Sequence, residues 1–407
     1  MLFIKLLSII LFVVLTIVEL FPMPIQNLSL YLFILWIISS LISFPKLLKH
    51  SFSQQRYLFL FFFLAFYFVT TSLGKNLYQG LIFTLYMMRV ISPIVMYDII
   101  KTCSSKIKKI FATTLLLIFV IYAIWMYQLI DIYGGELGLK NSVLGVGVDG
   151  EDRVGSAFGY VYSLPILILS LILYLRIILR QTRQNAVNHG WKKFTFYLVI
   201  TLYLLVLVVK SLFMTAIVLT ILSICLGLFY KSSRHWIMKS LTVLLSLIIV
   251  FLSQYQFIAT NISRLGSEST DQRVEEIYYF LTGQGSKAQD LSMRSDLSGV
   301  SIRTFFGHPI FGANHLVGFD RFKNDIIGNH AEWFDMLALY GIFALLLFSY
   351  LYKSLKYQYY DTGNYLPAYI YILIGFLNPM FYFIINLTVF VIAPLLNPYS
   401  SENIQAV

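Results

Sequence analysis

The residues best suited to chemistry lie together in one polar stretch, 293–341, between two long apolar segments. Its cations and imidazoles are Arg294, Arg303, His308, His315, Arg321, Lys323 and His330. Guanidinium groups bind phosphate oxygens through paired planar donors, and a neutral imidazole accepts a proton from an attacking hydroxyl. Because the surrounding chain is strongly apolar, this set predicts a site for an anionic ligand at the edge of a membrane.

His330 has the position expected of a general base, where the polar stretch meets the next apolar segment. Helix capping is the alternative interpretation, since Asn329 is a natural N-cap and Glu332 three residues later completes a box-like pattern. The two roles are compatible, because a helix N-terminus that faces a cavity also favours an anion. Asp335, one turn into the expected helix, would either orient His330 or serve the fold.

Three arginines are candidates for holding a diphosphate. Arg153 comes just before an apolar segment, and Arg294 lies at an expected helix start. Arg303 follows Arg294 by nine residues, about two and a half helical turns, so the two share roughly one half of that helix. The alternative is that these residues are solvated loop charges or bind lipid headgroups.

Two further cations lie in or beside apolar segments. Arg89 falls in the middle of one, so a buried partner or a water-filled cavity is expected around it. Lys210 lies at a tight turn between two apolar segments, where snorkelling to the membrane surface explains it as well as function does. Glu19 and Asp98 lie near the ends of such segments and are expected at the interface.

Several catalytic patterns do not occur in the sequence. There is no Walker A loop, no HExxH and no GxSxG. The histidines of the polar stretch are spaced too irregularly for a zinc site, and the two cysteines, Cys103 and Cys225, are expected at different levels of the membrane. The sequence therefore predicts neither a metal nor another cofactor.

The composition predicts a polytopic membrane protein. Of 407 residues, 58% are hydrophobic and only 12% are charged, and long uncharged runs recur. We expect an all-α transmembrane bundle that forms a single domain over 1–407, with about twelve spans. The last two spans could instead form one kinked segment with a re-entrant piece. The expected spans are 2–21, 28–44, 57–73, 81–100, 110–130, 158–175, 194–209, 211–229, 241–258, 331–351, 365–378 and 380–396.

The basic residues predict the orientation of these spans. Lys and Arg gather in alternate short loops, which places those loops and both termini in the cytoplasm. This bias also explains the net charge of +11, so no nucleic-acid partner is expected. The counted cations are Lys46, Lys49, Arg56, Lys101, Lys106, Lys108, Lys109, Arg176, Arg180, Arg183, Lys192, Lys193, Lys231, Arg234, Lys239, Lys353 and Lys356.

Two long loops then lie outside, 131–157 and 259–330. The second contains two expected helices, over 271–281 and 294–306. The helix over 294–306 could lie on the membrane surface or cap the bundle.

The polar stretch resembles the signature region of the O-antigen polymerase and ligase superfamily, and it is most similar to Wzy-type polymerases. The family pattern has an Arg opening a helix, a turn with Pro and Gly, and then His, Asp and Tyr-Gly running into a span. The matching positions here are Arg294, His308-Pro309-Ile310-Phe311-Gly312, His330, Asp335 and Tyr340-Gly341, with Arg153 matching an earlier loop element. Three departures are Lys210-Ser211, where the family often has Ser-Arg, Ala313, where a glycine often closes the turn, and Asn329-His330, which reverses the order of the ligase branch.

The resemblance implies a metal-independent glycosyltransferase of the GT-C type in the bacterial cytoplasmic membrane. It would polymerise undecaprenyl-diphosphate-linked repeat units into capsular or O-antigen polysaccharide, with a chain-length regulator and a flippase as further candidate partners. His330, Arg294 and Arg153 would be catalytic, and Arg303, Lys210, Arg89 and Asp335 would bind substrate. The alternatives are a ligase that transfers glycan to another acceptor, a lipid-linked oligosaccharide flippase or transporter, and a scaffold or sensor.

Overall fold

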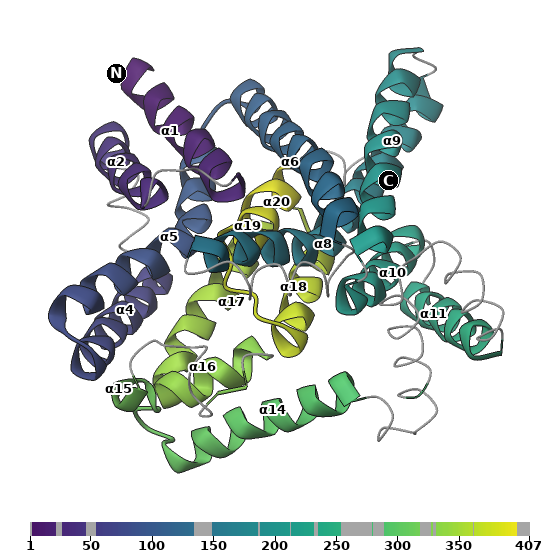
Figure 1. Cartoon of the computed structure of the whole chain (residues 1–407). Coiled ribbons are helices and arrows are strands. Elements are labelled where there is room, and N and C mark those ends of the chain that lie inside the picture. Colours follow the sequence, from purple (N-terminus) through teal and green to yellow (C-terminus); the bar gives the residue numbers. More distant parts are fainter. Residues whose placement is uncertain are drawn as a thin grey trace. The chain divides into compact units, whose positions relative to one another are not determined.

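The computed structural model describes residues 2–21, 27–45, 54–133, 149–185, 188–211, 213–231, 235–253, 279, 289–317, 327–328, 331–360 and 362–396. Within these residues every regular element is helical and no strand occurs, so the all-α prediction is confirmed (Figure 1). The expected helix over 271–281 lies outside the described residues.

Long apolar runs form the helices that the sequence predicts. Six of the described helices are long and apolar enough to cross a membrane, and shorter apolar helices occupy the other expected spans. The chain is thus a multi-pass helical membrane protein. The principal helices are α1 (Leu2–Leu20), α2 (Leu28–Ser43), α4 (Gln55–Gly74), α5 (Leu77–Lys101), α6 (Ser105–Tyr133), α8 (Asp149–Asn185), α9 (Asn188–Ser211), α10 (Met214–Phe229), α11 (Trp236–Ser253), α14 (Gln289–Gly307), α15 (Asn314–Val317), α16 (Glu332–Tyr340), α17 (Ala344–Tyr360), α18 (Leu366–Leu377), α19 (Phe383–Leu387) and α20 (Ala393–Leu396).

The chain divides into two compact units. Unit 1 combines both ends of the sequence, Met1–Ile118 and Asp296–Val407, and unit 2 is Phe119–Ser295. In unit 1, α1 packs on α2, α4 on α5, and α17 on α4. All the motif residues from His308 onward therefore belong to unit 1.

The C-terminal helices form the core of unit 1. α19, the π-helical turn Thr388–Ile392 and α20 are almost entirely buried, and this yellow element lies beside α5 in Figure 1. Its buried Asn386 donates to the Val90 carbonyl of α5 at 3.0 Å and accepts from the Tyr371 hydroxyl at 2.9 Å. The described residues form separate helices α18 and α19, rather than the alternative of one long kinked segment.

The expected span 331–351 is not one continuous α-helix. α16 ends at Tyr340, a 3₁₀ turn covers Gly341–Phe343, and α17 begins at Ala344. Gly341 causes the break, because its φ of 56° and ψ of −142° lie far from helical values. Figure 1 shows α16 and α17 running in different directions on either side of this break.

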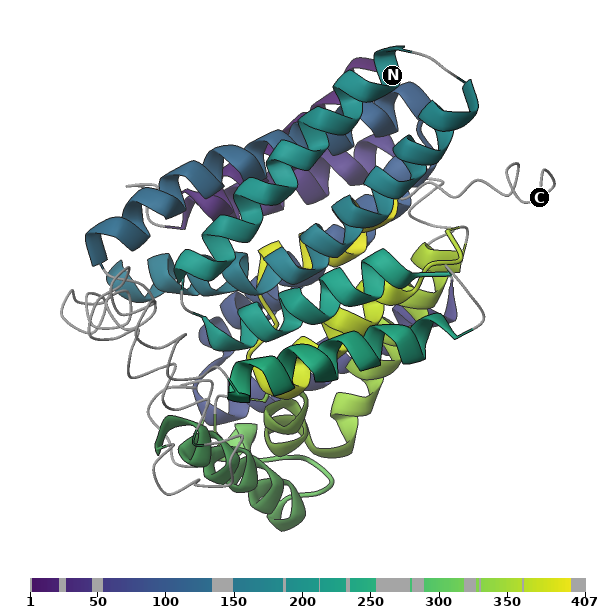
Figure 2. The same ribbon diagram turned by 90° about the vertical axis from the view of Figure 1, so that its right-hand side faces the viewer.

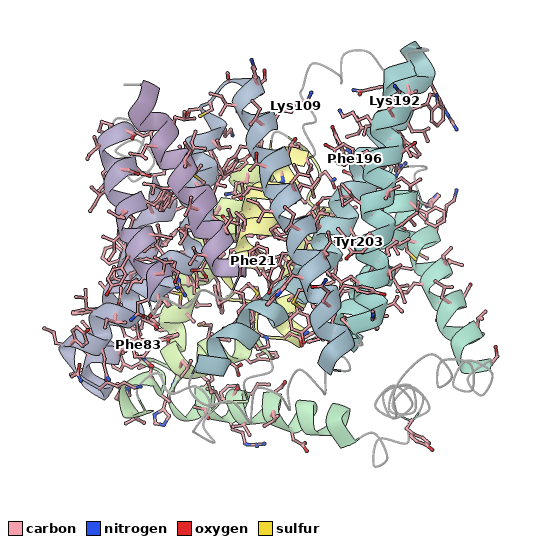
Figure 3. All side chains as sticks on the ribbon, turned by 45° about the horizontal axis from the view of Figure 1, so that its top comes forward. Phe21, Phe83, Lys109, Lys192, Phe196 and Tyr203 are labelled. Carbon is pink, nitrogen blue, oxygen red and sulfur yellow. The ribbon has the colours of Figure 1, made fainter. Side chains whose placement is uncertain are left out.

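Unit 2 is built on α8, whose apolar part is largely buried. α8 packs against α9 and α10, and α10 packs against α11, as the teal helices of Figure 2 show. Gly227 of α10 permits close packing on α8, since a Cβ there would meet the Ile172 side chain at 2.9 Å. Figure 3 shows Lys192 near the start of α9 and Tyr203 farther along it.

The outer loop expected over 131–157 is shorter than predicted. α6 continues to Tyr133 and α8 begins at Asp149, so both adjoining helices extend into it. Arg153 therefore lies in a helix and not in a loop, and its side chain is outside the described residues.

Candidate functional site

Two parts of the family-like motif, far apart in sequence, are joined by backbone hydrogen bonds. After α14 ends, the Gly312 N–H donates to the His308 carbonyl at 2.9 Å and closes a turn over 308–312. The Ile342 N–H donates to the Pro309 carbonyl at 2.9 Å, and the Ala313 N–H donates to the Ala338 carbonyl at the same distance. The turn is thus fixed on the junction between α16 and α17.

Glycine is required at two points of this contact. Gly312 has a φ of 67°, and a Cβ there would lie 2.1 Å from the Leu339 carbonyl oxygen. Gly341 has a φ of 56°, and its Cβ would lie 2.4 Å from the Ile310 carbonyl oxygen. A side chain at either position would meet backbone atoms that cannot rotate away, in addition to the cost of the left-handed conformation.

Asp335 lies at the centre of a second connection, between α14 and α16. Its side chain is fully buried, and the Ser301 hydroxyl of α14 donates to its Oδ1 at 2.5 Å. The Gly328 N–H donates in turn to the Ser301 oxygen at 2.8 Å. Ser301 therefore holds the chain segment before α16 on α14, and no motif in the sequence indicated this serine. Whether Asp335 orients His330 stays a prediction, because His330 lies outside the described residues.

The alternative interpretation of 329–332 as a capping box at the start of α16 is wrong. The N-cap is Ala331, without a side-chain cap bond, so the helix begins later than an Asn329 cap would place it. Glu332 is fully buried, and its carboxylate accepts from the Met380 N–H at 2.9 Å and the Phe381 N–H at 3.4 Å. Its long-range role is to hold the connection between α18 and α19, which a local capping rule cannot reveal.

The short helix α15 attaches this region to α4. Asn314 is buried and its amide donates to the hydroxyls of Thr70 and Thr71, both at 3.1 Å. The neighbouring His315 is partly exposed, with its Nδ1 buried. The hydrogen bonds from Asn314 to Thr70 and Thr71 join residues more than 240 positions apart, so no spacing in the sequence indicated them.

The predicted arginines of α14 have different surroundings. α14 begins at Gln289, so Arg294 lies in its second turn and not at the helix start, and its side chain is outside the described residues. Arg303 is exposed, two residues from the buried Ser301 and therefore on another side of the helix. Arg321 and Lys323 lie outside the described residues.

Arg89 has an ion-pair partner within the helices, and this partner, Glu19, is partly buried rather than fully buried. Its guanidinium forms an ion pair with Glu19 of α1 at 3.1 Å, donates to the Ser29 hydroxyl of α2, and lies 4.7 Å from the centroid of the Tyr86 ring. Pro93 removes the N–H that would bond the Arg89 carbonyl, and the Ser92 hydroxyl donates to that carbonyl at 2.7 Å instead. Arg89 thus connects three helices of unit 1.

Lys210 of unit 2 is engaged by aromatic rings. Its Nζ lies 3.5 Å from the centroid of Tyr127 on α6, and the Tyr127 ring lies 6.4 Å from that of Tyr203. A cation over a tyrosine face at a helix end fits snorkelling towards an interface. Its role in binding substrate stays a prediction.

A buried ion pair in unit 1 corrects the interpretation of two charges. Arg56, counted above as a loop cation, is 4% exposed and lies 2.5 Å from Asp98, which is 3% exposed and was expected at the interface. The Tyr57 hydroxyl also donates to Asp98, at 2.7 Å. The pair joins the start of α4 to the end of α5, and the Arg56 Nε–H donates in addition to the Gln54 side-chain oxygen at 2.9 Å.

Within the described ranges, no group of three or more His, Cys, Asp or Glu side chains is placed to hold a metal ion. Comparison with family models, curated proteins and solved structures gave no match to this chain.

Proposed function

We propose that the chain is a polysaccharide polymerase that joins oligosaccharide repeat units carried on undecaprenyl diphosphate, at the outer face of a bacterial cytoplasmic membrane. The protein would cross the membrane about twelve times, with both termini in the cytoplasm, and would adopt a GT-C-like arrangement. Polymer chemistry of this kind needs a lipid-facing bundle together with a polar, cation-rich region outside it, and the sequence provides both.

One structural observation supports this proposal above the others. The 308–312 turn bonds to the Tyr340–Ile342 junction, and Ser301 of α14 bonds to Asp335. The motif elements from the 308–312 turn to the Tyr340-Gly341 junction, which resemble those of the polymerase family, are therefore contiguous in unit 1. A chance scatter of degenerate motif letters would not be expected to give mutual backbone bonds and two matching positive-φ glycines.

The proposed reaction is a glycosyl transfer. A hydroxyl at the non-reducing end of the acceptor attacks the anomeric carbon of the donor glycan. A carbon–oxygen bond forms there, the bond to the diphosphate breaks, and undecaprenyl diphosphate leaves with the electron pair. The hydroxyl proton passes to His330 as general base. Arg294 and Arg153, assisted by Arg303, Lys210 and Arg89, stabilise the charge that develops on the diphosphate.

The test uses purified protein in lipid vesicles with undecaprenyl-diphosphate-linked repeat units and no nucleotide sugar or metal. Resolving the products by size should give a ladder of lipid-linked oligomers. Arg294→Ala and His330→Ala should abolish the ladder while still inserting into membranes. Lys353→Ala is the matched control, because its ammonium donates to the exposed Gln55 side-chain oxygen and lies over the Phe59 ring, outside the motif.

Other outcomes separate the alternatives. Units of unchanged length that cross the bilayer would replace the proposal with a flippase. Units transferred once to a different acceptor lipid or protein would replace it with a ligase. Normal ladders from both Arg294→Ala and His330→Ala would show that the site residues are wrong even if the reaction is right.

A further inference from the structure

The segment that follows α14 carries an exposed apolar surface that the proposed chemistry does not use. The six residues from Phe306 to Phe311 are all exposed. Phe306 is 73% exposed, Phe311 is 57% exposed and Leu316 is 59% exposed. Three large apolar side chains, each more than half exposed, therefore lie within eleven residues. Such a concentration exceeds what an aqueous surface normally carries in one place and marks a contact surface.

The backbone of this surface is attached to the rest of unit 1 by hydrogen bonds on its buried side. Gly312, Ala313 and Asn314 are buried beneath it. The Pro309 carbonyl accepts the Ile342 N–H, and Asn314 donates to Thr70 and Thr71 of α4. The buried side of the segment is therefore held by packing and by these hydrogen bonds, and the apolar side chains of Phe306, Phe311 and Leu316 face outward.

The surface continues onto a helix of membrane-spanning length. Phe66 of α4 stacks face to face on Phe343, with ring centroids 3.9 Å apart and planes 7° apart. Phe311 lies alongside both rings, 6.5 Å from Phe66 and 6.1 Å from Phe343. α4 is one of the helices long and apolar enough to cross a membrane, so the three rings connect the exposed turn to its outer face.

The neighbouring residues of α4 and α5 extend the same apolar surface. Leu73 at the end of α4 is 73% exposed, and Leu77 and Tyr78 at the start of α5 are similarly exposed. Figures 1 and 2 both show α14 and α15 beside α16 at one end of unit 1.

Polar groups border this surface in the pattern of a membrane boundary. Arg303 and His308 are exposed next to Phe306, and the Lys75 ammonium lies 5.1 Å from the centroid of the Phe83 ring. Cations and aromatic rings side by side are typical of the level where acyl chains meet phosphate headgroups. A surface that met an aqueous protein partner would not need to continue into the lipid-facing side of α4.

We propose that 306–316 lies in the bilayer boundary, with Phe306, Phe311 and Leu316 among the acyl chains of the leaflet on the side of the large loop. The occupant of this surface is bulk lipid. The inference is independent of the proposed reaction, because it rests on exposure, stacking and continuity with α4 alone.

The experiment measures the depth of spin labels in vesicles made of phosphatidylglycerol and phosphatidylethanolamine. Labels are placed one at a time by Phe306→Cys, Phe311→Cys and Leu316→Cys in the full chain carrying Cys103→Ser and Cys225→Ala. Their collision rates with oxygen, which concentrates in lipid, and with a water-soluble nickel chelate are compared. Phe62→Cys on the exposed side of α4 is the lipid control, and Asp296→Cys on the exposed side of α14 is the aqueous control.

The three test labels should show oxygen-to-nickel ratios several-fold above that of Asp296→Cys and approaching that of Phe62→Cys. Ratios equal to that of Asp296→Cys would overturn the proposal. Low collision with both reagents, together with dipolar broadening between labels, would also overturn it, because a second copy of the chain would then cover the surface. Since these positions are exposed, the labels should leave the size-exclusion profile unchanged, and any variant that changed it would be replaced by Ile310→Cys in the same turn.

Discussion

Gly312 and Gly341, 29 positions apart in the sequence, contact each other's neighbouring backbone in the structure. The Cβ that each lacks would collide with carbonyl oxygens from the other's segment, Leu339 in one case and Ile310 in the other. The relationship is reciprocal, so the turn after α14 and the break between α16 and α17 depend on each other. The shape of the candidate site therefore depends on two positions that carry no functional group.

Substituting either glycine by alanine should destabilise unit 1. A residue forced into the left-handed region costs about 1–3 kcal/mol, and the backbone collision adds to this. Gly312→Ala and Gly341→Ala should therefore lower the thermal unfolding temperature in detergent and reduce polymer yield in the vesicle assay.

Two other glycines separate the cost of the positive φ from the cost of the backbone collision. Gly363 also has a positive φ, of 59°, but a Cβ there meets nothing within 4 Å, so Gly363→Ala reports the conformational cost alone. Gly307 has free space and no positive φ, so Gly307→Ala should be close to neutral. Equal unfolding temperatures for the Gly312, Gly341 and Gly363 variants would show that the close backbone contact contributes nothing.

The side chains of Ser301 and Asp335 should be energetically coupled through their hydrogen bond. Ser301→Ala removes the donor to Asp335 and the acceptor for the Gly328 N–H. Leaving buried polar groups without this partner should cost about 1–3 kcal/mol. Asp335→Asn keeps an oxygen that can accept from Ser301 and should cost less than Asp335→Ala.

A double-mutant cycle measures that coupling directly. Unfolding free energies of Ser301→Ala, Asp335→Ala and the double variant should give an interaction energy of about 0.5–3 kcal/mol. Strict additivity would contradict a direct contribution of the bond to stability.

The sequence predicted the helices well because long apolar runs report them directly. The expected segment 28–44 corresponds to α2, Leu28–Ser43, and 365–378 corresponds to α18, Leu366–Leu377. The sequence-based prediction failed where the type of helix changes inside an apolar run. Neither the 3₁₀ turn at Gly341–Phe343 nor the π-helical turn at Thr388–Ile392 alters hydropathy, so no periodicity rule detects them.

For the candidate site, the sequence identified the pieces but not their contacts. Pro309, Gly312 and Gly341 were each part of a motif. The hydrogen bonds that join their two segments form only in the tertiary structure, so the sequence did not indicate them. Glu332 was interpreted by a local capping rule, whereas its carboxylate bonds to the backbone of Met380, 48 residues away. A buried carboxylate needs hydrogen-bond donors, and it takes them from any segment that packs against it. For Glu332 these donors come from a distant segment rather than from its own helix start.

The Arg56–Asp98 pair should be a large contributor to the cohesion of α4 and α5. Removing one member leaves the other charge buried, which typically costs about 3–5 kcal/mol. Arg56→Met and Asp98→Leu should each lower the unfolding temperature strongly, whereas the double variant should lower it by less than the sum. The exposed Gln55–Lys353 bond is the matched control, and Gln55→Ala should change stability by less than about 1 kcal/mol. A double variant as unstable as the sum of the singles would show that the pair is not coupled.

Exchanging the charges of Arg89 and Glu19 should show whether the Arg89 charge stabilises the fold or also binds substrate. If it only connects α1, α2 and α5, exchanging the partners by Arg89→Glu with Glu19→Arg should restore both stability and polymer synthesis. If it also binds diphosphate, as proposed, the exchanged variant should regain stability but keep a raised KM for the lipid-linked unit. The measurements are the unfolding temperature and the dependence of polymer yield on substrate concentration. Full recovery of both would remove Arg89 from the substrate site.

The orientation of the spans can be tested with the chain's own cysteines. Cys103 is partly exposed in the turn between α5 and α6, a turn that the basic residues assign to the cytoplasm. With Cys225→Ser, a membrane-impermeant maleimide should label Cys103 only after the membrane of spheroplasts is opened. A chain carrying Asp296→Cys as its only thiol should be labelled in intact spheroplasts, because Asp296 is exposed and the basic residues predict that its loop lies outside. A chain with Cys225 as its only thiol should resist labelling in both conditions, since Cys225 is buried. Labelling of Cys103 in intact spheroplasts and of Asp296→Cys only after opening would reverse the topology. It would also place the cation-rich segment in the cytoplasm, where the proposed substrate does not present its sugars.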